Sequence, residues 1–264
     1  MSADMEGVAT FARIRAVVDS GSGMAKIAAQ YIPSGVHPND VGIDDISITS
    51  SVVPEVEQQV VLDNYQQVMH NEDGRALIGT HAIRPWSRRN PQEAGRILEL
   101  YKLALCPEYK HTAAVAKVYR ILEVDIGDYG PLERVIQSIL KVYKGIIPDW
   151  YEQHSTINIQ GRGDLGEELI WRDVPIELQL TVPCMWKGRQ RGVMRNAAAG
   201  AGFVNCRLRS EPTCAAADIM FLLLKQGHIY VGSSATKLSV RVLTCYRLVI
   251  VSCSSLWPWH WGTW

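Results

Sequence analysis

The residues with the clearest chemical potential form a basic segment in the last third of the chain. Six cations lie between Leu178 and Ser210, with no acidic residue among them: Lys187, Arg189, Arg191, Arg195, Arg207 and Arg209. Surface cations are commonly neutralised by acidic partners three or four residues away, and this segment has none. Guanidinium groups bind phosphate oxygens through paired hydrogen bonds. The segment therefore predicts contacts with the phosphates of nucleic acid or of anionic lipid; a solvated loop is the alternative interpretation.

A second candidate for surface contact is the tryptophan-rich end of the chain. Four of the eight tryptophans occupy the last eight positions, within an apolar stretch that starts at Leu248: Trp257, Trp259, Trp261 and Trp264. Tryptophan favours the boundary between water and hydrocarbon because its ring is apolar and its N–H is polar. The stretch is shorter than the roughly 20 residues that span a bilayer and contains Pro258. We expect it to contact a membrane surface or a neighbouring subunit; packing on its own domain is the alternative.

No sequence pattern predicts a catalytic centre. Residues 161–166 fit the glycine spacing of dinucleotide sites, but Pro175 follows too soon for the long helix that such a site requires. Cys206, Cys214 and His228 lack the close spacing of zinc ligands. We therefore expect a non-enzymatic protein without a metal or a cofactor.

The net charge of zero hides a strong division along the chain. Residues 1–183 carry 17 Lys and Arg against 25 Asp and Glu, whereas residues 184–264 carry 10 against 2. Opposite charges at the two ends favour head-to-tail association, so we expect a homo-oligomer. The six cysteines form no CxxC pair, and the first residues lack the apolar core of a signal peptide. This predicts reduced thiols in the cytoplasm.

The elements that must position these residues change in character near residue 155. Apolar residues recur at helical spacing in five earlier segments: 8–18, 54–68, 90–105, 112–124 and 131–145. Strands are predicted in five later segments, two of which alternate clearly: 156–159, 176–182, 203–209, 228–232 and 237–251, with a short helix at 215–225. The predicted class is α+β, with a helical N-terminal part (about 1–150) before a mainly antiparallel sheet region. The predicted domains are an acidic helical region at 1–150, a basic strand-rich region at 151–247 and an apolar tail at 248–264.

Part of the chain resembles a family of viral proteins. Tyr129–Gly145 resembles a helix of the matrix proteins of negative-strand RNA viruses, in particular of rhabdoviruses, that ends in an aromatic residue shortly before a glycine. Gly166–Leu169 and Trp171–Leu180 are similar to the acidic turn and strand that follow in that family. The proline-rich PPxY motif of the family is absent. The resemblance implies a self-associating α+β protein that coats the inner face of a membrane and condenses a nucleocapsid.

The sequence thus predicts a matrix-like structural protein that self-associates and bridges an anionic membrane surface and a nucleoprotein. In this hypothesis the basic segment contacts phosphates, and the terminal tryptophans contact the membrane or a subunit. The expected location is cytoplasmic and peripheral to a membrane, or the virion. Two alternatives stay open, an RNA-binding nucleocapsid or coat protein and an enzyme of unrecognised family.

Overall fold

A computed structural model provides the fold of this chain in separate stretches. It describes residues 11–20, 25–37, 41, 46–49, 68–70, 76–79, 83, 88–89, 96–156, 159, 170–214 and 216. The strands are β1 (Arg13–Ser20), β2 (Ala25–Ile32), β3 (Ile46–Thr49), β4 (Val68–His70), β5 (Ala76–Ile78), β6 (Ile176–Val182) and β7 (Asn205–Ser210). The α-helices are α2 (Ala113–Leu122), α3 (Tyr129–His154) and α4 (Gly188–Gly200), and the 3-10 helices are η3 (Tyr101–Leu105), η4 (Pro107–Tyr109) and η5 (Trp171–Asp173).

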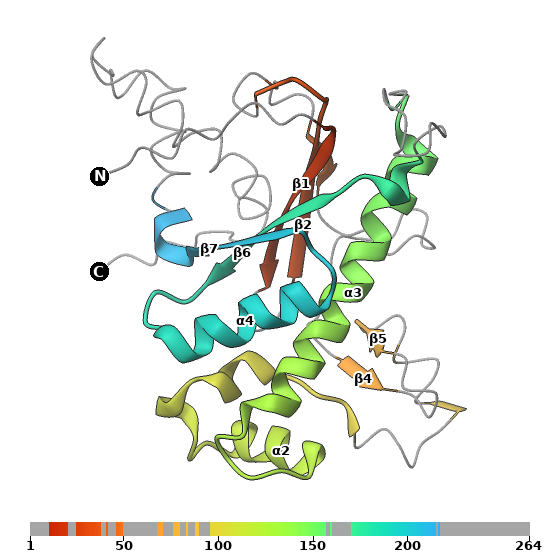
Figure 1. Ribbon diagram of the computed structural model, residues 1–264. Helices are drawn as coiled ribbons and strands as arrows, with labels where there is room; N and C mark the ends of the chain where they lie inside the picture. Colours follow the sequence, from red (N-terminus) through yellow and green to blue (C-terminus); the bar gives the residue numbers. More distant parts are fainter. Residues whose placement is uncertain are drawn as a thin grey trace, which may run out of the picture.

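A five-stranded mixed sheet organises the described residues (Figure 1). Its strand order is β3-β2-β1-β6-β7. β2 is antiparallel to both β1 and β3, whereas β6 is parallel to both β1 and β7. A separate sheet consists of the antiparallel pair β4 and β5. Because parallel strands point the same way, the carboxyl ends of β1, β6 and β7 lie along one edge of the main sheet.

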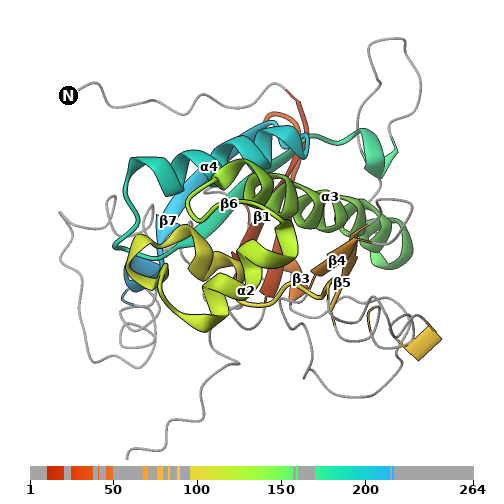
Figure 2. The same cartoon turned by 90° about the horizontal axis from the view of Figure 1, so that it is seen from below.

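Two helices cover one face of the main sheet. α3 and α4 contact each other, and Figures 1 and 2 show them side by side over the strands. One cluster of buried side chains joins the sheet to these helices: Ile14, Ala16 and Val18 of β1, Leu178 and Leu180 of β6, Leu132 and Ile136 of α3, and Val193 and Ala197 of α4. α4 is the crossover connection that the parallel strands β6 and β7 require.

Local signals define the beginnings of the two preceding helices. Thr112 caps α2, since its Oγ1 accepts a hydrogen bond from the Val115 N–H at 3.4 Å. Asp128 caps α3 by accepting from the Gly130 N–H at 3.0 Å. Such side chains satisfy backbone donors that have no partner within the helix. α3 continues past Gly145 to His154 because its apolar stripe continues with the fully buried Ile147 and Tyr151.

The predicted helical N-terminal part is wrong. Residues 13–18, predicted as helix, belong to β1, in which both faces are buried. Ile14, Val17 and Val18 lie three and four residues apart, which fits a helix, while the strand-like alternation of Arg13 and Arg15 with Ile14 and Ala16 is short. In the predicted helix at 90–105, the described residues form a β-bridge at Leu98 and the 3-10 helix η3. The prediction of a mainly antiparallel sheet is also wrong, because β1, β6 and β7 are parallel.

Other predicted elements are present. The helix at 112–124 is confirmed as α2, the helix at 131–145 as part of α3, and the strands at 176–182 and 203–209 as β6 and β7. Residues 188–195 of the basic segment, for which a solvated loop was the alternative interpretation, lie in α4. Several predictions fall wholly or largely outside the described residues: those at 54–68, 156–159, 215–225, 228–232 and 237–251. None of the described helices has the length and apolar composition needed to cross a bilayer.

The C-terminal end of α4 is held by two side chains from α3. Gln137 Nε2 donates to the Gly200 carbonyl oxygen at 2.7 Å, and Lys144 Nζ donates to the Gly202 carbonyl oxygen at 2.5 Å. Gly202 has a φ of +85°, and a Cβ atom there would lie 2.7 Å from Lys144 Nζ. The turn out of α4 therefore requires glycine for its backbone and for its contact with α3.

We expect Gly202→Ala to lower the free energy of unfolding by about 1–2 kcal/mol, the cost of a left-handed backbone for a residue with a Cβ. Urea unfolding followed by circular dichroism measures the change. Gly192→Ala is the matched control, because Gly192 lies within α4 and a Cβ atom there would meet open space; this variant should gain about 0.5–1 kcal/mol. A Gly202→Ala protein as stable as the parent would contradict the described turn.

Candidate functional site

Polar side chains gather where the parallel strands end. Asp19 is the penultimate residue of β1, Thr181 is the penultimate residue of β6, and Glu211 directly follows β7. The Thr181 hydroxyl donates a hydrogen bond to Asp19 Oδ1. Val18 and Leu180 are the last paired residues of β1 and β6, so the bonded side chains come next along two neighbouring strands. We call this region, with the residues that face it, the carboxyl edge.

A buried cation faces the carboxyl edge from η3. The Lys102 side chain is 4% exposed, and its Nζ lies 3.4 Å from Glu211 Oε1. Burial lowers the pKa of Lys102, while the negative charges of Glu211 and Asp19 oppose this effect. The Glu211 side chain is 42% exposed, so the loss of hydration falls mainly on Lys102. A buried lysine close to two carboxylates is therefore more typical of a functional site than of a packed core.

Two further groups lie close to these charges. Cys214 is buried, and its burial raises the pKa of the thiol to about 11; the charges of Asp19 and Glu211 act in the same direction, and that of Arg209 acts against them. Arg209 pairs in register with Thr181. The carboxyl edge thus combines two carboxylates, two cations and a hydroxyl group within a small region.

The carboxyl edge is also the place where the chain connections diverge. From β1 the chain turns to β2 on one side, whereas from β6 it passes through α4 to β7 on the other side. In open α/β sheets, ligands bind outside the carboxyl ends of the strands at such a switch point; here one of the two connections is the antiparallel β1–β2 hairpin rather than a helical crossover. Asp19 and Thr181 lie at the ends of the two strands that flank it. The position of the polar groups and the topology therefore indicate the same site.

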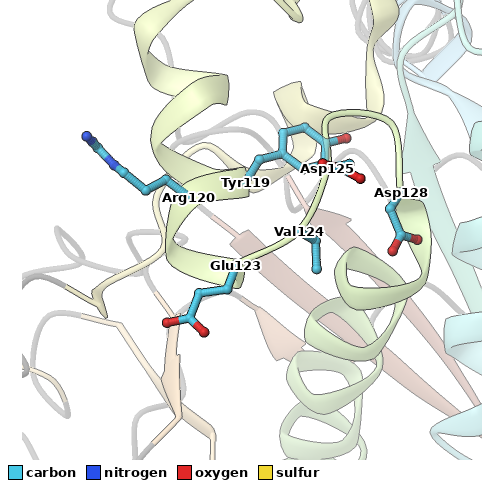
Figure 3. A pocket seen from close by; sticks show the side chains of 6 residues that line it. All are labelled: Tyr119, Arg120, Glu123, Val124, Asp125 and Asp128. Atoms are coloured by element: carbon cyan, nitrogen blue, oxygen red, sulfur yellow. The ribbon is translucent and has the colours of Figure 1, made fainter.

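A separate surface hollow lies at the connection from α2 to α3 (Figure 3). Its volume is about 570 Å³, and its lining consists of Tyr119, Arg120, Glu123, Val124, Asp125 and Asp128. Figure 3 shows Arg120 and Glu123 directed outward, on the opposite side of the hollow from Asp128. Three carboxylates against one guanidinium do not favour an anion. Within the described part of the chain, no group of three or more His, Cys, Asp and Glu side chains is arranged to hold a metal ion.

The chain matches no protein-family model, and no curated protein matches it. The chemistry of the site therefore rests on its geometry alone.

Half of the predicted phosphate-binding residues lie at the beginning of α4, where two of them make internal contacts through their side chains. Lys187 is the N-cap residue, and its N–H donates to Gln190 Oε1 at 3.1 Å. The Arg189 guanidinium lies 4.5 Å from the ring centroid of Tyr129, and its Nη2 donates to the Gly127 carbonyl oxygen at 3.3 Å. Arg191 Nε donates to the Trp186 carbonyl oxygen at 3.0 Å. These two arginine side chains therefore join α4 by hydrogen bonds to the turns that precede α3 and α4.

The structure does not bring all six predicted cations to one surface. Arg195 is exposed on α4, which covers the sheet face that carries Leu178 and Leu180. Arg207 and Arg209 pair with Gln179 and Thr181, whose side chains belong to the opposite face. Arg209 is the one of the six that we place at the carboxyl edge. Phosphate binding by these residues stays a prediction, and the terminal tryptophans 257, 259, 261 and 264 lie outside the described residues.

Of the residues that we place at the carboxyl edge, Arg209 alone was among the sites predicted from the sequence. One signal was present in the sequence: Asp19 follows the apolar residues 16–18 and is followed closely by Gly21-Ser22-Gly23. Lys102 and Glu211 carry no such local signal, since they are 109 residues apart in the sequence. Only the tertiary structure pairs them.

The thiols provide a test of burial at this edge. At pH 8 we expect iodoacetamide to modify the exposed Cys184 well before Cys206 and Cys214, because the pKa of each of the latter is raised to about 11 and little of either is the reactive thiolate. Peptide mass spectrometry after timed exposure measures the order. The urea-unfolded chain, in which all three should react alike, is the control. Equal rates for Cys184 and Cys214 in the folded chain would contradict the described burial.

Proposed function

We propose that the carboxyl edge binds the phosphate groups of a nucleotide together with a divalent cation. The observation that carries this proposal is the Asp19–Thr181 pair at the switch point between β1 and β6, faced by the buried Lys102. The cationic and hydroxyl side chains would contact the phosphates, and the carboxylates would contact the cation.

The donors at the carboxyl edge suit phosphate oxygens. The ammonium group of Lys102 and the guanidinium of Arg209 supply positive charge, and the Thr181 hydroxyl supplies a hydrogen-bond donor once it turns from Asp19. By sequence, the residues that link β1 to β2 begin with Gly21-Ser22-Gly23. Glycine permits the backbone N–H groups to approach a phosphate closely, since no Cβ intervenes.

The carboxylates require a cation if a phosphate is bound. The carboxylates of Asp19 and Glu211 would repel a phosphate at close range. A phosphate can therefore bind there only if a positive charge lies between it and the carboxylates. Mg²⁺ is commonly held by one or two carboxylates together with substrate phosphates and water, so a cage of protein ligands is not needed. A bound Mg²⁺ would neutralise phosphate charge, and Asp19 is the residue that would hold it. Sites that hold Mg²⁺ through carboxylates and substrate phosphates are common for nucleoside diphosphates and triphosphates, so these are the ligands that we propose.

The membrane-bridging, matrix-like role is a separate proposal. Lys187, Arg189 and Arg195 are exposed on α4, which leaves them accessible to anionic lipid or RNA. Nucleotide binding at the carboxyl edge neither requires nor excludes that role, because the two involve different parts of the molecule.

Isothermal titration calorimetry of the full chain with MgADP, MgATP and magnesium pyrophosphate tests the nucleotide proposal. We expect Asp19→Asn to weaken MgADP binding by about tenfold or more, the usual effect of losing a charge-assisted contact. Asp125→Asn, in the remote acidic hollow, is the matched control and should bind as the parent does.

Absence of binding to all three ligands by the parent chain would refute the proposal. Equal affinity for pyrophosphate and the nucleotides would restrict it to the phosphates alone. Phosphate release from MgATP, followed in the same samples, tests the expectation that the protein is not an enzyme.

A further inference from the structure

We infer that Trp186 is a positioning residue, which holds the ammonium group of Lys102 at the carboxyl edge and thereby controls the affinity of that site for phosphate. The effect on affinity rests on the proposed function, whereas the positioning itself does not. Trp186 lies in the turn between β6 and α4 and is 4% exposed. Trp186 was not among the residues on which the predictions from the sequence rest.

The indole contacts both the cation and the helix that carries it. Lys102 Nζ lies 5.6 Å from the centroid of the Trp186 ring. The indole Nε1–H donates to Cys106 Sγ at 2.9 Å, and Cys106 is the residue at which η3 ends. Cation–π attraction is strongest for tryptophan and increases when the cation is removed from water. One side chain thus fixes the ammonium group and one end of η3.

The backbone of Trp186 is fixed to the strand that carries Thr181. Its N–H donates to the Pro183 carbonyl oxygen at 3.2 Å, and its carbonyl oxygen accepts from Arg191 Nε at 3.0 Å. Pro183 directly follows β6. The indole therefore determines where Lys102 lies relative to Thr181, although the two residues come from distant parts of the chain.

Lys102 needs such support because its own helix is short and irregular. η3 is a five-residue 3-10 helix that begins after Leu100, a residue in the left-handed region with φ of 53°. Lysine also has a long side chain with many rotamers. Glu211 and Asp19 attract the ammonium group toward the carboxyl edge. The face of Trp186 restricts the side chain without competing for the phosphate.

Nuclear magnetic resonance of the full chain labelled with ¹³C-lysine tests the positioning without a ligand. We expect the ring current of Trp186 to shift the ε-methylene protons of Lys102 upfield, with the signal assigned by its loss in Lys102→Met. Trp186→Phe, which keeps a ring face but lacks the N–H, should retain part of the shift. Trp186→Leu should abolish the shift, while Trp150→Leu, a tryptophan stacked on His154 of α3, should leave it unchanged. A Lys102 signal that is the same in Trp186→Leu and the parent would overturn the inference.

A double-mutant cycle in MgADP affinity tests the consequence for binding. We expect Lys102→Met and Trp186→Leu each to weaken binding by about tenfold, and the double variant to bind no worse than Lys102→Met, because Trp186 acts through Lys102. Losses that multiply in the double variant, or parental affinity in Trp186→Leu, would overturn the inference. If the parent chain binds no nucleotide, the proposed function fails, and the lysine spectra alone decide whether Trp186 positions Lys102.

Discussion

The parallel pairing of β1 with β6 is the interaction on which the rest of the described structure depends. It runs from Ile14 opposite Ile176 to Val18 opposite Leu180, and it connects an early hairpin to the later strand–helix–strand unit of β6, α4 and β7. Parallel strands cannot be joined by a tight turn, so a long connection must pass between them. That connection includes α3, which packs with α4 on the sheet face formed by these strands. The same pairing brings Asp19 beside Thr181 at the carboxyl edge.

Charged groups within the sheet illustrate two different ways of compensating burial. On the face opposite the helices, Arg13 Nε and Arg15 Nη2 lie 3.4 Å and 3.6 Å from the two carboxylate oxygens of Glu177. One carboxylate there contacts two cations, near the beginning of the paired strands. At the carboxyl edge the arrangement is reversed, because the single buried ammonium of Lys102 faces Glu211 and Asp19. The ion-paired network of Glu177 with the two arginines stabilises a single arrangement of these side chains. At the carboxyl edge, by contrast, the positive and negative charges do not balance, and a charged ligand could compensate for the difference.

The position of Lys102 relative to Thr181 depends on contacts between several elements. η3 precedes α2, and the turn that carries Trp186 precedes α4; the Trp186–Cys106 hydrogen bond and the packing of the indole on Lys102 join them. The Gln137 and Lys144 side chains of α3 hold the other end of α4. Because α4 is held at both ends, we expect a substitution at either end to shift the side chains at the carboxyl edge.

The sequence by itself determined those features that depend on neighbouring residues. The helix caps at Thr112 and Asp128, the helices α2 and α3 and the alternating strand β6 follow from local preferences and periodicity. β1 was predicted as a helix because Ile14, Val17 and Val18 fit helical spacing and its alternating part, Arg13 to Ala16, is short. Asp19 had a local signal in the glycines that follow it. The pairing of Lys102 with Glu211 across 109 residues and the contact of Trp186 with Lys102 were decided only by the tertiary structure, because nothing in a local sequence pattern specifies which distant strand ends share an edge.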